Sequence, residues 1–163
     1  MARELIYPLE KGTLSHIGHK AELLQFLRSQ NISVPQTFVC VWDAFDRYQA
    51  GDPTLSEQLR IELARKLGDT QKYAVRSSAN VEDGRQFSFA GQFRTILDVS
   101  GMESLVTAIK TVWDSVHTGD LDAYLQTAGV KSGQVKMAVL LQEMVTPVVS
   151  GVVFSKNPLT GLD

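Results

Sequence analysis

Residues 73–99 read YAVRSSANVEDGRQFSFAGQFRTILDV, and the rest of the chain is organised around this stretch. It opens with a short apolar run that ends at Arg76, and it closes with the alternating apolar residues of positions 96–99. The residues between these two runs are polar and include Gly91. Such a pattern predicts a strand, a loop and a second strand.

The loop predicted here has the residue types of an anion site. It would present the guanidinium of Arg76 and the hydroxyls of Ser77 and Ser78. Gly91 would let backbone N–H groups come close to the anion, because it has no Cβ. A phosphate suits these groups best. An ordinary hairpin with an exposed arginine accounts for the same residues equally well, since glycine-containing loops are common and arginine is usually on the surface.

The composition narrows the classes of function. The 163 residues are 44% hydrophobic and 21% charged, as in an ordinary globular protein. A net charge of −2 argues against nucleic-acid binding, which usually shows as a basic excess. No apolar run approaches the roughly 20 residues that span a bilayer. The single cysteine, Cys40, lies in an apolar run and is expected to be buried and inert, and these features together favour a cytoplasmic location.

Three groups of residues in the central stretch match a known signature in register. They are AVRSSA at 74–79, ED at 82–83 and SFAGQ at 88–92. The match resembles the ATP-grasp nucleotide-binding domain of the phosphoenolpyruvate synthase and pyruvate phosphate dikinase family. This resemblance implies an α/β (α+β) fold in which helices flank a mixed sheet. It also implies that residues 1–145 form the first lobe of the domain and that residues 146–163 begin a truncated second lobe.

The same resemblance implies a role for a lysine near the N-terminus. Gly18, His19 and Lys20 lie at the predicted start of a helix in which Leu23, Leu24 and Leu27 make an apolar face. On the residues alone, a lysine here is a solvated surface charge. The family has a G-G-K-x-x-x-L element at this distance from its N-terminus, and its lysine reaches the nucleotide phosphates. Histidine replaces the second glycine of that element, at a steric cost if the position needs a positive φ.

A second predicted site lies at the end of residues 136–145, an apolar strand that becomes polar as it ends. The segment QEMV at 142–145 resembles the hinge of the family, Q-x-M-V, where the backbone bonds the edge of adenine. The resemblance therefore implies catalytic roles for Arg76 and Lys20. It implies nucleotide binding by the following residues: Lys20, Arg76, Ser88, Phe89, Ala90, Gly91, Gln92, Gln142, Glu143, Met144 and Val145.

Helices and strands outside these motifs are predicted from apolar spacing. A strand is expected through Val41 and a short helix over 43–49, and a further helix over 122–128. Two longer helices have their apolar residues on one face, with capping-box spacing at Thr54/Glu57 and Ser100/Glu103. The core residues of these helices are Leu55, Leu59, Leu63 and Leu67 in the first, and Leu105, Ile109, Val112 and Val116 in the second.

The resemblance implies transfer of a phosphoryl group from ATP, through a carrier histidine in another domain, to a small acceptor such as pyruvate. Mg²⁺ is expected as a cofactor, with its ligands outside this chain. His16, His19 and His117 do not match the setting of the carrier histidine. The SFAGQ loop favours the phosphoenolpyruvate synthase and rifampin phosphotransferase branches, with the synthase branch ranked first.

Two interpretations of the short chain stay open. It is either part of a longer phosphotransferase, in which case it binds ATP weakly and has negligible turnover alone, or a non-catalytic module that binds a nucleotide or a partner. No membrane or nucleic-acid partner is expected. A dinucleotide-binding fold is disfavoured because no G-x-G-x-x-G follows a predicted strand.

Overall fold

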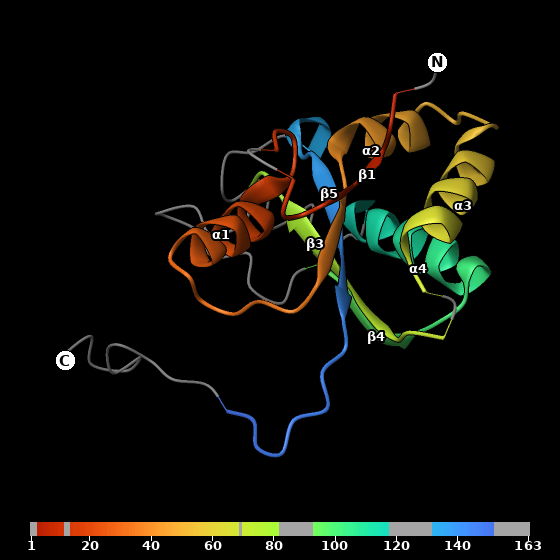
Figure 1. The fold of residues 1–163 in the computed structure, drawn as a ribbon. Coiled ribbons are helices and arrows are strands. Elements are labelled where there is room, and N and C mark those ends of the chain that lie inside the picture. Colours follow the sequence, from red (N-terminus) through yellow and green to blue (C-terminus); the bar gives the residue numbers. More distant parts are fainter. Residues whose placement is uncertain (1–2, 12–13, 69, 82–92, 118–131, 152–163) are drawn as a thin grey trace.

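The computed structural model describes residues 3–11, 14–68, 70–81, 93–117 and 132–151. These residues form one five-stranded sheet and four α-helices (Figure 1). The strands are β1 (Ile6–Pro8), β2 (Thr37–Cys40), β3 (Tyr73–Ala79), β4 (Thr95–Val99) and β5 (Met137–Glu143). The helices are α1 (Gly18–Ser29), α2 (Trp42–Gln49), α3 (Leu55–Lys66) and α4 (Met102–Asp114), with short 3₁₀ turns η1 (Ser115–His117) and η2 (Ser132–Gln134).

The strands lie in the order β1-β2-β5-β3-β4, and every pairing among the described residues is antiparallel. β5 is the last of the described strands along the sequence and takes the central position, between β2 and β3. Its continuous apolar run suits that position, because a central strand covered on both faces has no solvated side. The predicted α/β (α+β) class is confirmed, but the described strands form an antiparallel sheet in place of the mixed sheet that was predicted. The two strands expected in the central stretch are also confirmed, since β3 pairs with β4, while most of the residues between them lie outside the described part of the chain.

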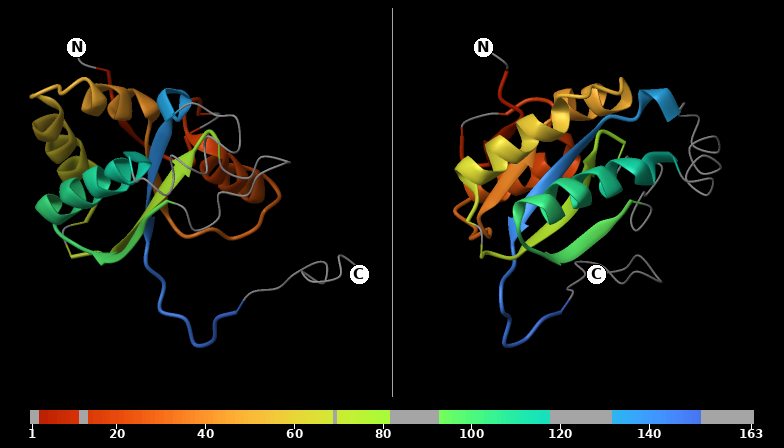
Figure 2. Two further views of the ribbon diagram at one scale, coloured as in Figure 1. Left: turned by 180° about the vertical axis from the view of Figure 1, so that it is seen from behind. Right: turned by 90° about the vertical axis from the view of Figure 1, so that its right-hand side faces the viewer.

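The two faces of the sheet are covered unequally. α2, α3 and α4 lie on one face, and α1 lies on the other (Figures 1 and 2). The larger apolar core lies under the three helices and includes Phe45, Trp113 and Val139. A smaller cluster lies under α1 and includes Ile17, Ala21 and Leu140. Part of the sheet face on the α1 side is therefore available to polar residues.

Apolar spacing predicted the two longer helices well and α1 poorly. All eight predicted core residues of α3 and α4, counting Leu67 and Val116 just beyond their ends, are buried. In α1 the buried residues are Gly18 and Ala21, whereas Leu23 is 56% exposed. The apolar face predicted there is wrong in part, because α1 packs through its first turn. Cys40 is buried as predicted, and burial raises the pKa of its thiol.

Neither predicted capping box forms. The helix starts are close to those predicted, but neither N-terminal cap makes a side-chain hydrogen bond to its helix. Glu57 and Glu103 both pair with Arg60, which ties α3 to α4. The carboxylate of Asp52 accepts from the backbone N–H of Thr54 and so organises the start of α3. The two glutamates of the predicted capping boxes therefore pair with an arginine, and an aspartate two residues before Thr54 organises the start of α3.

The first turn of α1 lies directly against β3. Gly18 has a φ of +74°, and a Cβ added to it would lie 2.1 Å from the carbonyl oxygen of Ser78. The Ser78 hydroxyl accepts from the backbone N–H of Ala21 at 3.0 Å and donates to the carbonyl of Ile17 at 2.7 Å. Residue 18 must therefore be glycine for both conformational and steric reasons.

His19 does not occupy a strained position. It lies within α1, and among the described residues positive φ angles outside glycine occur only at His16, Asn31 and Asp98. The positive φ that the motif requires falls on Gly18. The replacement of the second glycine by histidine therefore carries no backbone cost.

Replacing Gly18 by alanine is expected to destabilise the protein more than the same change at Gly51. Gly51 also has a positive φ, of +70°, but its Cβ would meet no described atom within 4 Å. The strain of a left-handed alanine costs about 1–2 kcal/mol at either residue, and Gly18→Ala adds the clash with Ser78. Chemical denaturation of the two variants measures the difference. Equal losses of unfolding free energy would contradict the close approach described here.

Candidate phosphate and nucleotide site

A group of polar side chains lies on the α1 side of the sheet. In the strand register, Thr37 is opposite Gln142, while Arg76 is opposite Leu140. Directly opposed residues of antiparallel strands share a face, and Leu140 belongs to the cluster under α1. Thr37, Gln142 and Arg76 therefore belong to the α1 face. These three residues come from β2, β5 and β3, three neighbouring strands.

Arg76 lies in the middle of β3, not in a loop. The predicted boundary was wrong because Ser77, Ser78 and Ala79 continue the strand, paired with β5 as far as Met137. The side chain of Arg76 is half-buried, and its Nη1 donates to Oε1 of Gln142 at 2.9 Å. The guanidinium is thus held by a partner that carries no charge.

Lys20 approaches the same strand from α1. It lies in the first turn of the helix, and its Nζ is 3.5 Å from Oγ of Ser77. Ser77 is the residue after Arg76 and lies one position beyond the last pair of β3 with β4, Arg76 with Thr95. The ammonium of Lys20 therefore lies next to the residue that follows Arg76 in β3. The side chains of Arg76 and Ser77 leave the strand on opposite faces, because Arg76 is opposite Leu140 and Ser77 is opposite Val139.

Ser78 does not face an anion as the sequence suggested. Its hydroxyl makes two hydrogen bonds to the backbone of α1 and the residue before it, and the residue is fully buried. The serine therefore serves to attach α1 to β3. The expectation that it contributes a hydroxyl to a phosphate site is corrected by these contacts.

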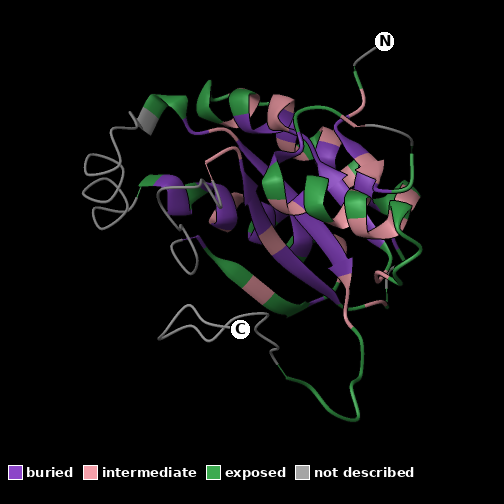
Figure 3. Cartoon of the chain, turned by 90° about the vertical axis from the view of Figure 1, so that its left-hand side faces the viewer, coloured by how far each residue is buried: buried purple, intermediate pink, exposed green. Residues whose placement is uncertain are grey.

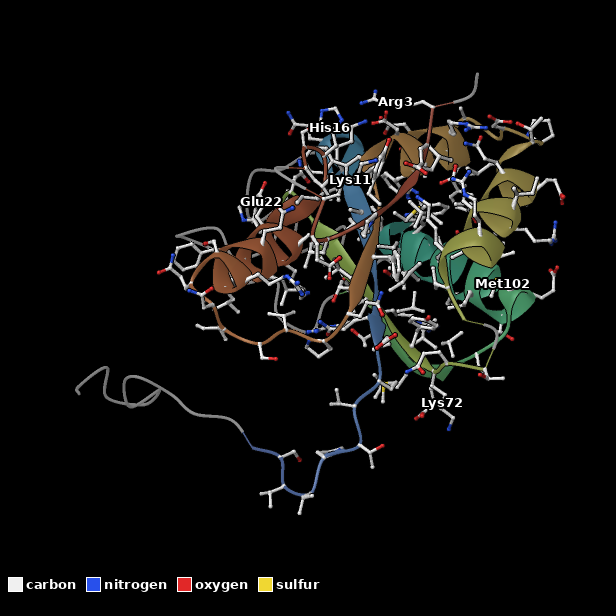
Figure 4. The ribbon with its side chains drawn as sticks, in the orientation of Figure 1. Arg3, Lys11, His16, Glu22, Lys72 and Met102 are labelled. Carbon is white, nitrogen blue, oxygen red and sulfur yellow. The ribbon has the colours of Figure 1, made fainter. Side chains whose placement is uncertain are left out.

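The predicted hinge follows the end of β5. The N–H of Glu143 donates to the carbonyl of Gln36, and the N–H of Met144 donates to the carbonyl of Lys72, both at 2.9 Å. The chain then leaves the sheet near Lys72, and the segment that follows is exposed (Figures 3 and 4). Among the described residues, the N–H of Val145 has no acceptor, so it is the first main-chain donor of the hinge that a ligand could use.

Tyr73 lies beside this exit at the start of β3. Burial raises the pKa of its phenol, and the nearby carboxylate of Glu143 adds to that rise. The phenol oxygen accepts from the N–H of Gly68 at 3.3 Å, which acts in the opposite direction. The tyrosine is therefore neutral at ordinary pH, and the hinge side of the sheet gains no negative charge from it.

The predicted SFAGQ loop falls outside the described residues. This loop contains five predicted nucleotide-binding residues: Ser88, Phe89, Ala90, Gly91 and Gln92. The acidic pair Glu82 and Asp83 also lies outside the described residues. The predicted helix over 122–128 also lies outside them. No group of three or more histidine, cysteine or acidic residues that could hold a metal occurs among the residues described.

Sequence reasoning missed the side-chain roles of Thr37 and Gln142. Thr37 was not singled out, and Gln142 was selected for its backbone at the hinge. One signal was present in the sequence: Gln142 is a polar residue at the end of the apolar run MAVLL. A buried amide in a central strand must find partners, which here are an arginine and a threonine.

No helix within the described part of the chain is long or apolar enough to cross a bilayer.

Comparisons with known proteins identify a family and several relatives of this chain. A family model described as the pyruvate phosphate dikinase AMP/ATP-binding domain matches residues 54–163. The rifampicin phosphotransferase of Bacillus subtilis is 38% identical over 193 aligned residues, which cover 95% of this chain and 22% of the relative. That of Streptomyces sviceus is 31% identical over 192, covering 94% and 22%. The phosphoenolpyruvate synthase of Aeropyrum pernix is 41% identical over 106, covering 62% and 13%.

The chain thus spans less than a quarter of each of these three relatives. The relatives confirm the resemblance that the central stretch indicated, because their names are those of the family and of its rifampin branch. The family model covers most of the chain, including all of β3, β4 and β5. The protein therefore belongs to the pyruvate phosphate dikinase AMP/ATP-binding domain family.

Proposed function

We propose that this chain is the ATP-binding portion of a phosphotransferase, and that its described part corresponds to the first lobe of an ATP-grasp domain. The observation that carries the proposal is that the Lys20 ammonium lies 3.5 Å from the hydroxyl of Ser77, the residue next to Arg76 in β3, whose guanidinium is held by the neutral amide of Gln142. Two cations held in this way suit a polyphosphate, because each phosphate group carries negative charge and accepts several hydrogen bonds. The family match to an AMP/ATP-binding domain supports the same ligand.

In this proposal, each side chain has a different task. Arg76 offers a planar set of N–H donors that can bind two phosphate oxygens at once, and Gln142 accepts only one of its bonds. Lys20 adds a compact charge on a flexible stem and can follow the phosphoryl group as charge moves. Both cations stabilise negative charge that grows during transfer, which is how enzymes of this chemistry gain most of their rate.

Mg²⁺ commonly neutralises charge between the transferred and leaving phosphates in such reactions. The described residues do not offer a metal site of their own, since they include no suitable group of acidic or histidine side chains. We therefore derive no step through the metal. Its protein ligands are proposed to lie outside this chain.

The adenine base is proposed to bind at residues 142–145. With the N–H groups of Glu143 and Met144 bonded inside the sheet, the N–H of Val145 is the donor proposed to meet the base. The side chain of Gln142 is bonded to Arg76 and Thr37, so it does not serve as the adenine contact. The SFAGQ loop at 88–92 is proposed to cover the phosphates.

The acceptor is proposed to be a small molecule such as pyruvate, phosphorylated through a carrier histidine in another domain. The names of the relatives include both phosphoenolpyruvate synthase and rifampicin phosphotransferase. The SFAGQ motif favours the synthase and rifampin branches, and we rank the synthase branch first. A cytoplasmic location, the division of the chain at residue 145 and the start of a second lobe at 146 are part of the same proposal.

The phosphate site is tested by titration calorimetry of this chain with ATP, with and without Mg²⁺. Arg76→Ala and Lys20→Ala are each expected to weaken ATP binding by about tenfold or more, because each removes a charge-assisted hydrogen bond of about 1.5–3 kcal/mol. Adenosine should bind all three proteins alike, since it has no phosphate.

Arg65→Ala and Lys110→Ala are the matched controls. Arg65 lies on α3 and Lys110 lies on α4, and both helices cover the opposite face of the sheet. Their ATP affinity should equal that of the unchanged chain. Retention of full affinity by both Arg76→Ala and Lys20→Ala would remove these residues from the site. A folded chain that binds no ATP at millimolar concentration would favour the non-catalytic partner-binding module.

The adenine site is tested by Val145→Pro, which removes the N–H that the base is proposed to use. Val145→Pro is expected to weaken ATP and adenosine binding by the same factor, about three- to tenfold, because a single neutral hydrogen bond is lost. Val145→Ala keeps the N–H and should bind both ligands normally. If the proline variant binds as well as the alanine variant, the hinge does not bind adenine through this group.

A further inference from the structure

We propose that Gln142 is a positioning residue that fixes the orientation of the Arg76 guanidinium for phosphate binding. The inference rests on the proposed function, because it concerns how the same phosphate site is held in place. It assigns Gln142 a task different from the hinge contact that its motif suggested. Thr37 takes part in the same task as the support of the Gln142 amide.

Four groups form a continuous chain of hydrogen bonds across the sheet. Nη1 of Arg76 donates to Oε1 of Gln142 at 2.9 Å, and Nε2 of Gln142 donates to Oγ1 of Thr37 at 3.1 Å. The Thr37 hydroxyl donates in turn to the carbonyl oxygen of Pro35 at 2.8 Å. This chain of hydrogen bonds therefore begins at Arg76, which is proposed to bind phosphate, and ends at the backbone carbonyl of Pro35.

The direction of every bond in this chain is determined. Arginine can only donate, so it must meet the carbonyl oxygen of the Gln142 amide and not its nitrogen. The NH₂ group of that amide then faces Thr37, whose hydroxyl can accept from it and donate to Pro35. No group in the chain can reverse without losing a partner. One orientation of the amide is therefore favoured strongly over the flipped one.

Strand pairing holds the residues at both ends of this hydrogen-bond chain in place. Thr37 and Gln142 are opposite each other in the β2–β5 ladder, and Ala74, two residues before Arg76, is opposite Gln142 in the β3–β5 ladder. Thr37 is fully buried and Gln142 is 8% exposed. Water competes little for these bonds, so losing one partner leaves a buried polar atom unsatisfied.

An amide suits this position for a chemical reason. A leucine would continue the apolar run of β5 and would leave the guanidinium without this acceptor. A carboxylate would accept the same bond, but it would form an ion pair and compete with a phosphate for the positive charge of Arg76. The amide holds the guanidinium and leaves its charge available. A side chain held in advance also loses less freedom when the ligand binds.

The test uses Gln142→Leu, Gln142→Glu and Thr37→Val, with Thr37→Ser as the conservative control. Calorimetry is expected to show ATP binding weakened about threefold to tenfold by Gln142→Leu and less by Thr37→Val, with adenosine binding unchanged in both. Gln142→Glu should weaken ATP binding at least as much as Gln142→Leu, since its carboxylate pairs with Arg76. Thr37→Ser should bind ATP normally because it keeps the hydroxyl.

A double-mutant cycle separates positioning from a general structural effect. In an Arg76→Ala background, Gln142→Leu is expected to cause no further loss of ATP affinity, because it acts only through the arginine. Equal effects of Gln142→Leu in both backgrounds would overturn the inference, as would an equal loss of adenosine binding. If Arg76→Ala weakens ATP binding and Gln142→Leu does not, the phosphate site stands and the positioning role falls.

A second measurement does not depend on the ligand. ¹⁵N NMR of the guanidinium in the ligand-free chain should show slow rotation of the Arg76 Nη groups, and this restriction should be lost in Gln142→Leu and reduced in Thr37→Val. Identical guanidinium spectra in the folded variants and the unchanged chain would overturn the inference. Absence of ATP binding by the unchanged chain would instead overturn the proposed function, so the two failures are distinguishable.

Discussion

The close approach of α1 to β3 is the constraint on which the site depends. It requires that residue 18 have no side chain, because a Cβ there would collide with the backbone of Ser78. The Ser78 hydroxyl then bonds the backbone on both sides of that glycine, at Ile17 and Ala21. Lys20 lies between these attachment points and has little freedom to move relative to β3. The position of its main chain relative to β3 is thereby set by these contacts.

The unequal covering of the sheet explains where a polar site can exist. Three helices close one face over the larger core, whereas α1 alone covers the other (Figure 2). A polar group on the first face must find partners inside the larger core, as the Glu62 carboxylate does with the N–H groups of Leu5 and Ile6, or else cost roughly 1–3 kcal/mol. On the α1 face, Thr37, Gln142 and Arg76 satisfy one another across three strands. The apolar core and the polar site therefore occupy opposite faces of one sheet.

Features with a short period were predictable from the sequence, and features of long-range pairing were not. The leucines of α3 recur at helical spacing and are buried, as expected. Leu23 has the same kind of spacing but is exposed, because periodicity does not tell which turn of a helix packs. The end of β3 was misplaced because the polar residues Ser77 and Ser78 resemble a loop when their partners in α1 and β5 are unknown. The two cations were found through a motif, but the support that Gln142 gives Arg76 depends on the strand order.

β5 connects the two halves of the proposed nucleotide site. The side chain of Gln142 reaches back to Arg76, while the next residue, Glu143, bonds through its N–H to Gln36, the neighbour of Thr37. The same ends of β2 and β5 are thus joined by a side-chain bond, from Gln142 to Thr37, and by a main-chain bond, from Glu143 to Gln36. A shift of β2 against β5 would break the hydrogen bonds that support Arg76. It would also move the point at which the chain leaves the sheet and enters the predicted hinge. The register of this strand pair therefore sets the proposed phosphate end and the proposed adenine end of the site together. A substitution confined to either end would leave that register intact.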